Sequence, residues 1–339
     1  MTTVSNGSQT RESPGRFRKL ANRVDPADPV LILAPPCTFS WVVCAMLGQH
    51  PQMFGLPELH LFSVDTIGEW LAQCARESFD MDHGLVRTVA QVFFGAQNDN
   101  SISRARGWLR RRAHFTTGFL LETIAEQVRP LVPVEKSPSI VYRPDFMQRA
   151  LQMYPTARFI HLVSHPGVYA ESVMAAIREL SMRHPLPPSH WLLNLASFPR
   201  REPGTLPDTP AIDPQVGWHA LNKTILEFLE SVPARQKRTF RGEDLLRGTT
   251  SVLTEVCEWL GLRSDAEAFG EMQHPEGSPF ATYGPMSAPF GSDMFLLEGP
   301  MLRPVWTVQH NLEGSVGWRQ DEQGYFPEVK ALAEQFGYQ

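Results

Sequence analysis

Four short runs that read as buried strands, three of them mainly apolar, constrain the fold of this chain more than any other feature. Long stretches with helical patterns separate them. The four runs cover residues 29–35, 132–135, 158–164 and 237–241, and each is too short for a buried helix. Parallel strands that are buried on both faces read as such runs, and helices connect them as crossovers. We therefore predict an α/β fold, a single domain with a central parallel sheet flanked by helices.

The segments between these runs differ in composition. Apolar residues recur at helical spacing in 218–232 and in 253–260, and Gly261 after the second segment suits a helix C′ position. Residues 65–130 carry several helical patterns and are predicted to be a helical insertion. Residues 184–217 contain eight prolines, which exclude a continuous helix or a central strand and predict a lid. Residues 277–317 read as a loop-rich C-terminal region.

The N-terminal residues 1–25 are polar and lack the apolar segment of a secretory signal, so we expect a disordered leader before one domain at 26–339. The formal net charge of −5 gives no reason to expect a nucleic-acid partner. The sequence contains no run of about 18 apolar residues, so it predicts no membrane span. The four cysteines lie far apart without the spacing of metal ligands, so we predict free thiols, no metal site and a cytoplasmic protein.

The first run continues into the sequence APPCTFSWVVCAML, residues 34–47. A strand, a tight loop and a helix form the architecture of phosphate-binding loops, because the helix N-terminus offers N–H groups and a favourable dipole to an anion. The Gly-rich loop ending in Lys-Ser or Lys-Thr that nucleotide hydrolases use is absent. Nucleotide hydrolysis is therefore not predicted.

Four segments, in order, resemble the PAPS-dependent sulfotransferase superfamily. Residues 34–46 are similar to its 5′-phosphosulfate loop, and VEKSP at 134–138 to its Asp-Lys-Ser-Pro segment. Residues 157–172 are similar to the 3′-phosphate segment, and FRGEDLL at 240–246 to an Arg-Tyr-Glu-Asp-Leu segment. The sequence PELH at 57–60 most resembles sulfotransferases of polyketide pathways, which sulfate a β-hydroxyl on a carrier-tethered acyl chain. The resemblance implies the sulfotransferase fold, which is related to that of P-loop proteins.

This chain departs from the family at the residues that grip the donor. The resemblance implies a donor site at Cys37, Thr38, Phe39, Ser40, Trp41, Ser164 and Ser172. Cys37 and Ser164 stand where the family has arginines, Phe39 stands for a glycine, and Trp41 for a threonine. Two lost arginines correspond to about 3–6 kcal/mol, or roughly two to four powers of ten in affinity. We therefore expect no cofactor, and we expect Phe39 and Trp41 to fill part of the phosphate space.

The resemblance implies that His60 is the general base, since a neutral imidazole accepts a proton near pH 7. Glu58 is expected to orient His60 or to act as an acid, and Lys136 to contact an anion or the reacting oxygen. Purely structural roles are the alternatives: a backbone-bonded histidine, a salt-bridged carboxylate and a structural ion pair. A basic run is either a solvated helix face or a surface for an acidic acyl carrier protein; it comprises Arg104, Arg106, Arg110, Arg111 and Arg112.

Together these features predict a natural-product tailoring enzyme of the polyketide type. The expected chemistry is acid–base catalysis without PAPS, namely dehydration, cyclisation or isomerisation of a hydroxyacyl substrate, free or carrier-tethered. Two alternatives stay open. One is a PAPS-dependent O-sulfotransferase acting on a hydroxyl acceptor, and the other is a non-catalytic binding module.

Overall fold

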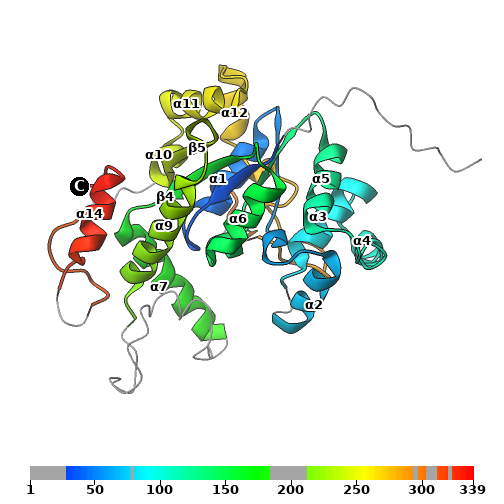
Figure 1. The fold of residues 1–339 in the computed structure, drawn as a ribbon, viewed down its shortest axis with the longest axis horizontal. Helices are drawn as coiled ribbons and strands as arrows, with labels where there is room; N and C mark the ends of the chain where they lie inside the picture. The colour runs from blue at the N-terminus through cyan, green and yellow to red at the C-terminus, as the bar shows by residue number, and fades with distance from the viewer. Residues whose placement is uncertain (1–27, 78–79, 184–211, 293–296, 303–310, 320–322) are drawn as a thin grey trace, which may run out of the picture.

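β1 (Val30–Leu33) is the central strand of a five-stranded, entirely parallel sheet with the order β2-β3-β1-β4-β5 (Figure 1). Its neighbours are β3 (Val132–Glu135) and β4 (Arg158–Val163), while β2 (Met53–Gly55) and β5 (Lys237–Arg241) form the edges. The computed structural model describes residues 28–77, 80–183, 212–292, 297–302, 311–319 and 323–339. The predicted α/β fold with a central parallel sheet is confirmed.

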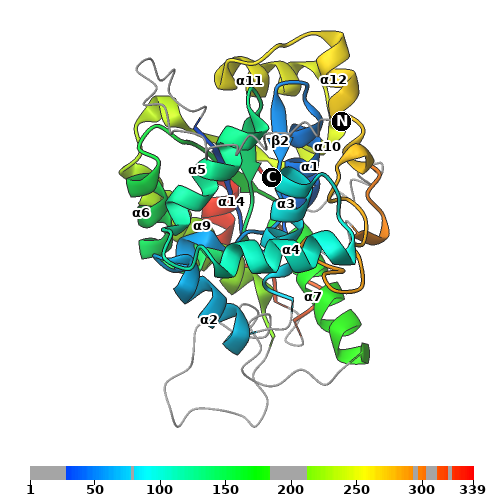
Figure 2. The ribbon, with the colours of Figure 1, turned by 90° about the vertical axis from the view of Figure 1, so that its right-hand side faces the viewer.

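Side chains that alternate along each strand build two hydrophobic layers, as expected for a sheet covered on both faces. Leu31 and Leu33 of β1 belong to a core with α2 (Ile67–Glu77), α3 (His83–Phe94), α4 (Asp99–Arg110), α5 (Thr117–Val128), α6 (Pro144–Met153) and α9 (Pro214–Glu230). Val30 and Ile32 face α1 (Ser40–Gln49), α10 (Gly242–Arg247), α11 (Thr250–Leu260) and α12 (Ala266–Met272). Figure 2 shows α3, α4 and α5 packed together near β2.

The four predicted strands are present, but two of them end one or two residues early, at Leu33 and Val163. The prediction missed β2, whose three residues pair with β3 from Met53 opposite Val132 to Gly55 opposite Val134. The helical patterns at 218–232 and 253–260 correspond to α9 and α11. Gly261 ends α11 in the left-handed conformation, with φ of 72°.

Pro214 corrects the predicted boundary of the lid. It is the first residue of α9, where a fixed φ and a missing N–H cost nothing, so 214–217 are helical. The segments 1–25 and 184–211 lie outside the described residues, and the division of the chain at residue 25 stays a prediction. The stretch 65–130 contains α2 to α5, and 278–292 form loops.

The C-terminal segment packs over the end of β4. Residues of α7 (Pro166–Arg183), α9 and α14 (Pro327–Gln335) share one hydrophobic cluster. The hydroxyl of Tyr338 donates to Oε2 of the buried Glu243, 2.8 Å away, and the backbone N–H of His165 donates to Oε1 of the same carboxylate, also at 2.8 Å. Two segments far apart in sequence thereby lock the turn that follows β4.

The loop 278–292 is tied to α3 by a buried arginine. The Arg87 guanidinium donates to the carbonyl oxygens of Phe290 and Thr282 at 2.7 and 2.8 Å and to the Gln97 side chain at 2.6 Å. None of the four cysteines, all of which lie in the described ranges, forms a disulfide. Across the described ranges, no helix has the length and apolar character needed to cross a membrane.

Candidate active site

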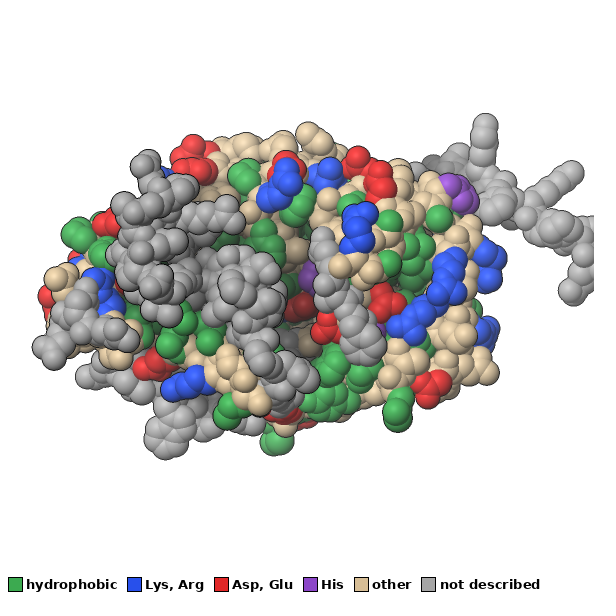
Figure 3. Space-filling view, turned by 90° about the horizontal axis from the view of Figure 1, so that it is seen from below, with side chains coloured by type: hydrophobic (Ala, Val, Ile, Leu, Met, Phe, Trp, Pro, Cys, Tyr) green, Lys and Arg blue, Asp and Glu red, His purple; other side chains and the backbone are tan. Residues whose placement is uncertain are grey.

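The carboxyl ends of β1, β3 and β4 meet at one edge of the sheet. The chain leaves β1 toward α1 on one side of the sheet order and reaches β4 on the other side, so the strand order reverses at β1. Open α/β sheets bind their ligands in the crevice outside such a switch point. Figure 3 shows this side of the molecule with a hollow in which acidic and histidine side chains are visible between hydrophobic ones.

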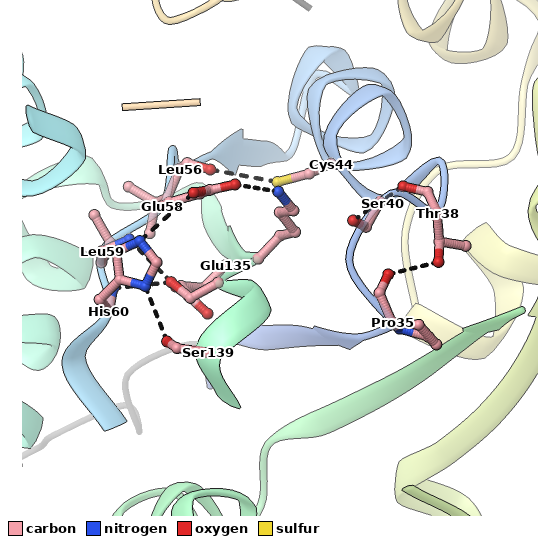
Figure 4. A network of polar contacts seen from close by, with 12 residues as sticks. Pro35, Thr38, Ser40, Cys44, Leu56, Glu58, Leu59, His60, Glu135 and Ser139 are labelled. Carbon is pink, nitrogen blue, oxygen red and sulfur yellow. Dashed lines mark hydrogen bonds and ion pairs between the residues drawn. The ribbon is translucent and has the colours of Figure 1, made fainter. Parts of the chain in front are cut away.

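Glu58, His60 and Lys136, the three predicted catalytic residues, lie together at this edge. Figure 4 shows Glu58 and His60. The Lys136 ammonium forms an ion pair with Oε1 of Glu58. Oε2 of the same carboxylate lies 3.5 Å from Nε2 of His60, and the side chains of His60 and Glu58 are 15% and 20% exposed. Nδ1 of His60 lies 2.9 Å from Oγ of Ser139. The imidazole is thus held between a carboxylate and a hydroxyl.

Ser137 fixes the backbone that carries the imidazole. His60 has a φ of 53°, in the left-handed region that costs a non-glycine residue about 1–2 kcal/mol. Oγ of Ser137 accepts hydrogen bonds from the N–H groups of Leu59 and His60 at 3.0 and 2.9 Å. Its own hydroxyl donates to the buried Glu135 carboxylate. All three hydrogen-bonding capacities of this hydroxyl are used, and they hold the turn at His60.

Close backbone packing fixes Glu58. Its N–H donates to the carbonyl oxygen of Gly291 at 2.9 Å. Gly84, in the first turn of α3, approaches so closely that a Cβ there would lie 2.0 Å from the Glu58 carbonyl oxygen. Nε1 of Trp70 donates to the carbonyl oxygen of Leu59, 3.1 Å away. The segment that carries Glu58 is therefore clamped between α3, α2 and the loop 278–292.

The two carboxylates of the site have opposite pKa shifts. Burial alone raises the pKa of Glu58, but the Lys136 charge and the contact with His60 outweigh burial and lower this pKa to about 2. Burial raises the pKa of Glu135 to about 7, although the hydrogen bond from Ser137 lowers it. Glu58 is therefore ionised at neutral pH, whereas Glu135 titrates near neutrality.

The first loop turns its side chains into the protein. Cys37 has a φ of 61° and packs against the hydrophobic cluster of α7 and the C-terminal segment. The hydroxyl of Thr38 donates to the carbonyl oxygen of Pro35 at 2.5 Å, and that of Ser40 to the carbonyl oxygen of Thr38 at 3.4 Å (Figure 4). Both predicted hydroxyl ligands are thus bonded to the backbone of the loop itself.

The two aromatic side chains of the loop point to different neighbours. Phe39 packs against α10, where a Cβ on Gly242 would lie 2.6 Å from its ring. Trp41 packs against Ala45 and Ala281. Trp41 also lines a small cavity of about 20 Å³ that reaches Glu58 and Lys136, enough room for about one water molecule.

Ser164 and Ser172 are the remaining residues predicted to bind the donor. Ser164 is buried at the end of β4, and its hydroxyl has no hydrogen-bond partner among the described residues. Ser172 lies in α7, and no hydrogen bond joins it to Glu58 or His60 in the described part of the chain. Within the same ranges, no group of three or more His, Cys, Asp or Glu side chains has a metal-binding arrangement.

The structure adds Ser137, Ser139 and Glu135 to the predicted site. The resemblance to the Asp-Lys-Ser-Pro segment ends at Pro138 and assigned a role only to Lys136. The signal that could have identified these residues is their position at the carboxyl end of β3, beside the switch point.

The five arginines of the basic run differ in their contacts. Arg104 and Arg112 stack over aromatic rings at 4.1 and 3.7 Å, and Nε of Arg106 lies 2.9 Å from an aspartate that precedes α3. Arg110 and Arg111, at the end of α4, are exposed and have no ion-pair partner among the described residues. In Figure 3 basic side chains gather at the right, the side of Figure 1 on which α4 lies.

Comparisons with known proteins agree with the fold. Residues 29–266 match the sulfotransferase family. The fold is similar to the sulfotransferase domain from the curacin biosynthetic pathway, with 20% identity, a TM-score of 0.68, and coverage of 93% of this chain and 99% of that one. It is also similar to the sulfotransferase domain from the Synechococcus PCC 7002 olefin synthase, with 21% identity, a TM-score of 0.64, and coverage of 96% and 99%. No curated protein sequence matches significantly.

Proposed function

The chain belongs to the sulfotransferase family, and we propose that it works without the sulfate donor, as an acid–base enzyme of natural-product metabolism. The proposed substrate is a β-hydroxyacyl thioester, and the proposed reactions are dehydration, cyclisation or isomerisation. The similarity to domains of the curacin pathway and of an olefin synthase supports this substrate class. The placement of His60 between Glu58 and Ser139 is the observation that carries the proposal.

The electrostatics of the site suit proton transfer at His60. Ionised Glu58 lies beside Nε2, which favours the neutral tautomer with its proton on that nitrogen. The lone pair of Nδ1 is then the basic position. Once Nδ1 has taken a proton from carbon or oxygen, the imidazolium is stabilised by Glu58 and returns the proton to a leaving hydroxyl. In a dehydration the net products are an enoyl thioester and water.

The residues at the donor positions do not fit the phosphates of PAPS. Thr38 and Ser40 direct their hydroxyls to the loop backbone, and Cys37 packs in an apolar cluster. No arginine stands at 37 or 164. We expect adenosine 3′,5′-bisphosphate, the desulfated product, to bind weakly or not at all in titration calorimetry. Low-micromolar affinity would show that this count of lost contacts is wrong.

A proton-exchange assay tests the role of His60 directly. Incubated in deuterium oxide with β-hydroxybutyryl pantetheine thioester, the protein should exchange the proton next to the thioester carbonyl, as measured by mass spectrometry. His60→Gln should slow this exchange by about 10²–10⁴-fold, the usual contribution of general acid–base catalysis. His114→Gln, at an exposed histidine after α4, is the matched control. A folded His60→Gln protein with native exchange would remove His60 from the mechanism and direct attention to Lys136.

PAPS-dependent sulfation is the second candidate, because the chain belongs to the family and retains Lys136 and Ser172. Incubation with PAPS and the same thioester separates the two: a sulfated product in the mass spectrum supports sulfation and contradicts the donor-free proposal. A non-catalytic binding module is the third candidate. It requires that native protein and His60→Gln both fail to exchange the proton and to form any product.

We further propose that an acidic acyl carrier protein binds at the end of α4. Arg110 and Arg111 offer two exposed cations there, and they contribute no ion pair to the described structure. Charge reversal in Arg110→Glu/Arg111→Glu should weaken the binding of an acyl carrier protein and cause no other defect. Arg238→Glu, at an exposed arginine of β5, is the matched control. Equal binding by both variants would contradict this surface.

A further inference from the structure

The Ser139 hydroxyl lies within hydrogen-bond distance of the His60 imidazole, which is the arrangement of a nucleophile and its base. We infer that Ser139 attacks acyl thioesters and that the protein therefore also transfers or hydrolyses acyl groups through an acyl-serine intermediate. The inference rests on the proposed role of His60 as a base. It concerns a residue for which the sequence indicated no role.

The geometry has the three parts that an activated serine needs. Oγ of Ser139 is within hydrogen-bond distance of Nδ1 of His60, at 2.9 Å. The opposite nitrogen of the ring faces Oε2 of Glu58 at 3.5 Å. A nucleophile in contact with a base, and a third group that orients the base, is the signature of covalent catalysis. Figure 4 shows His60 between the other two residues.

The charge on Glu58 decides the direction of proton transfer. Lys136 holds this carboxylate ionised, with a pKa lowered to about 2 against the opposing effect of burial. An ionised carboxylate beside Nε2 favours a proton on that nitrogen, so the lone pair of Nδ1 points to the Ser139 hydroxyl. The serine faces Nδ1 and the carboxylate faces Nε2, which is the reverse of the arrangement in the serine proteases. The order of nucleophile, base and acid is the same.

The backbone on both sides of this relay is fixed. Ser139 belongs to the short 3₁₀ helix η2 (Pro138–Val141), which follows β3 directly, and its side chain is only partly buried. The two N–H bonds to Ser137 hold His60 in its left-handed conformation. Because the nucleophile and its base are each attached to a rigid element, their approach is built in before a substrate arrives.

The proposed reaction needs no reactant other than the acyl thioester and water. Ser139 Oγ attacks the thioester carbonyl carbon while its proton passes to Nδ1 of His60. The carbon–sulfur bond breaks, and the leaving thiolate takes that proton, which gives an acyl ester on Ser139 and free pantetheine thiol. Water then attacks the ester and delivers a proton to His60. His60 returns the proton to Ser139 Oγ as the carboxylic acid leaves.

Intact-mass spectrometry after incubation with octanoyl pantetheine thioester tests the proposal, because this probe has no β-hydroxyl to eliminate. We expect an octanoyl adduct, mapped to Ser139 by peptide analysis, and labelling of the same residue by a fluorophosphonate probe. Ser139→Ala should abolish both signals, and Ser139→Cys should restore the acyl adduct. His60→Gln should slow labelling at least about tenfold, the effect of losing one activating hydrogen bond of about 1.5 kcal/mol.

Ser63→Ala is the matched control, because the Ser63 hydroxyl also lies beside His60 but donates to its carbonyl oxygen and to Gln73. This variant should be acylated like the native protein. The absence of any adduct, or an adduct at another residue, would overturn the proposal. The proton-exchange assay separates the two proposals: if the native protein exchanges the proton but forms no adduct, the acid–base function stands and the nucleophile does not.

Discussion

Replacing Lys136 by methionine should leave the Glu58 carboxylate without its main compensating charge and thereby destabilise the protein. The substitution keeps an unbranched side chain and removes the ammonium that pairs with Glu58. In the native protein the pKa of Glu58 is about 2, compared with an ordinary value of 4.5. This interval corresponds to about 3 kcal/mol of stability at neutral pH. Without Lys136, only the contact with His60 opposes the effect of burial on Glu58, and we expect a loss of about 3–5 kcal/mol.

The sign of the pH dependence distinguishes this reasoning from a general packing defect. In the native protein the contribution of Glu58 is complete above its unfolded pKa, and it is lost as the pH falls toward the folded pKa of about 2. In Lys136→Met we expect burial to raise the folded pKa of Glu58 above the unfolded value, so that the variant becomes less stable as the pH rises. The difference between the two proteins should therefore grow from about pH 4 to about pH 8.

Urea unfolding, followed by circular dichroism at several pH values, measures this difference. The double variant Glu58→Gln/Lys136→Met removes both charges and should show a much smaller pH dependence. Lys223→Met is the surface control, since Lys223 and its partner Glu227 are each 62% exposed and 3.9 Å apart. It should change the free energy of unfolding by less than about 1 kcal/mol. A Lys136→Met protein whose loss is the same at every pH would refute the electrostatic explanation.

Three further substitutions test other parts of the structure. Burial lowers the pKa of His161 to about 4 despite its hydrogen bond to Asn222, so the native protein should lose about 3 kcal/mol as the pH falls from about 6.5 to 4. His161→Gln should move the acid-unfolding midpoint to lower pH, and an unchanged midpoint would contradict this. Gly84→Ala should displace the Glu58 backbone and cost about 1–3 kcal/mol together with proton-exchange activity; native activity would count against the clamp. Arg87→Met leaves two carbonyl oxygens of the loop 278–292 without their donor and should cost at least about 2 kcal/mol in urea unfolding, whereas a neutral result would show that the loop is held elsewhere.

The sheet was largely predictable because the sequence marks its buried strands. The predicted strand segments 132–135 and 237–241 coincide with β3 and β5 to the residue, although Phe240 is the only apolar residue of the second segment. The edge strand β2 was not predictable, because three residues carry no alternation and the last of them is a glycine. Pro214 was misread because proline is compatible with a loop and equally with the first turn of a helix.

Only those site residues that stand in segments resembling a family could be predicted from the sequence. Glu58, His60 and Lys136 stand in segments that resemble a family, and the structure brings them together. The hydrogen bond from the His60 N–H to Ser137 joins residues 77 positions apart, and no local pattern encodes it. Ser139 follows a predicted strand, but its importance depends on which way the imidazole ring faces, and the sequence does not show this.

The lock between Tyr338 and Glu243 has a consequence for the order of events during synthesis. All five strands lie before residue 242, so a growing chain contains the complete sheet long before Tyr338 has been made. Domains fold as units while the chain emerges from the ribosome. Until Tyr338 emerges, Glu243 holds the turn after β4 with only one of its two hydrogen bonds. A ribosome stalled shortly before residue 338 should therefore display a nascent domain that is already ordered in its sheet yet still open to proteases at the turn between β4 and α7.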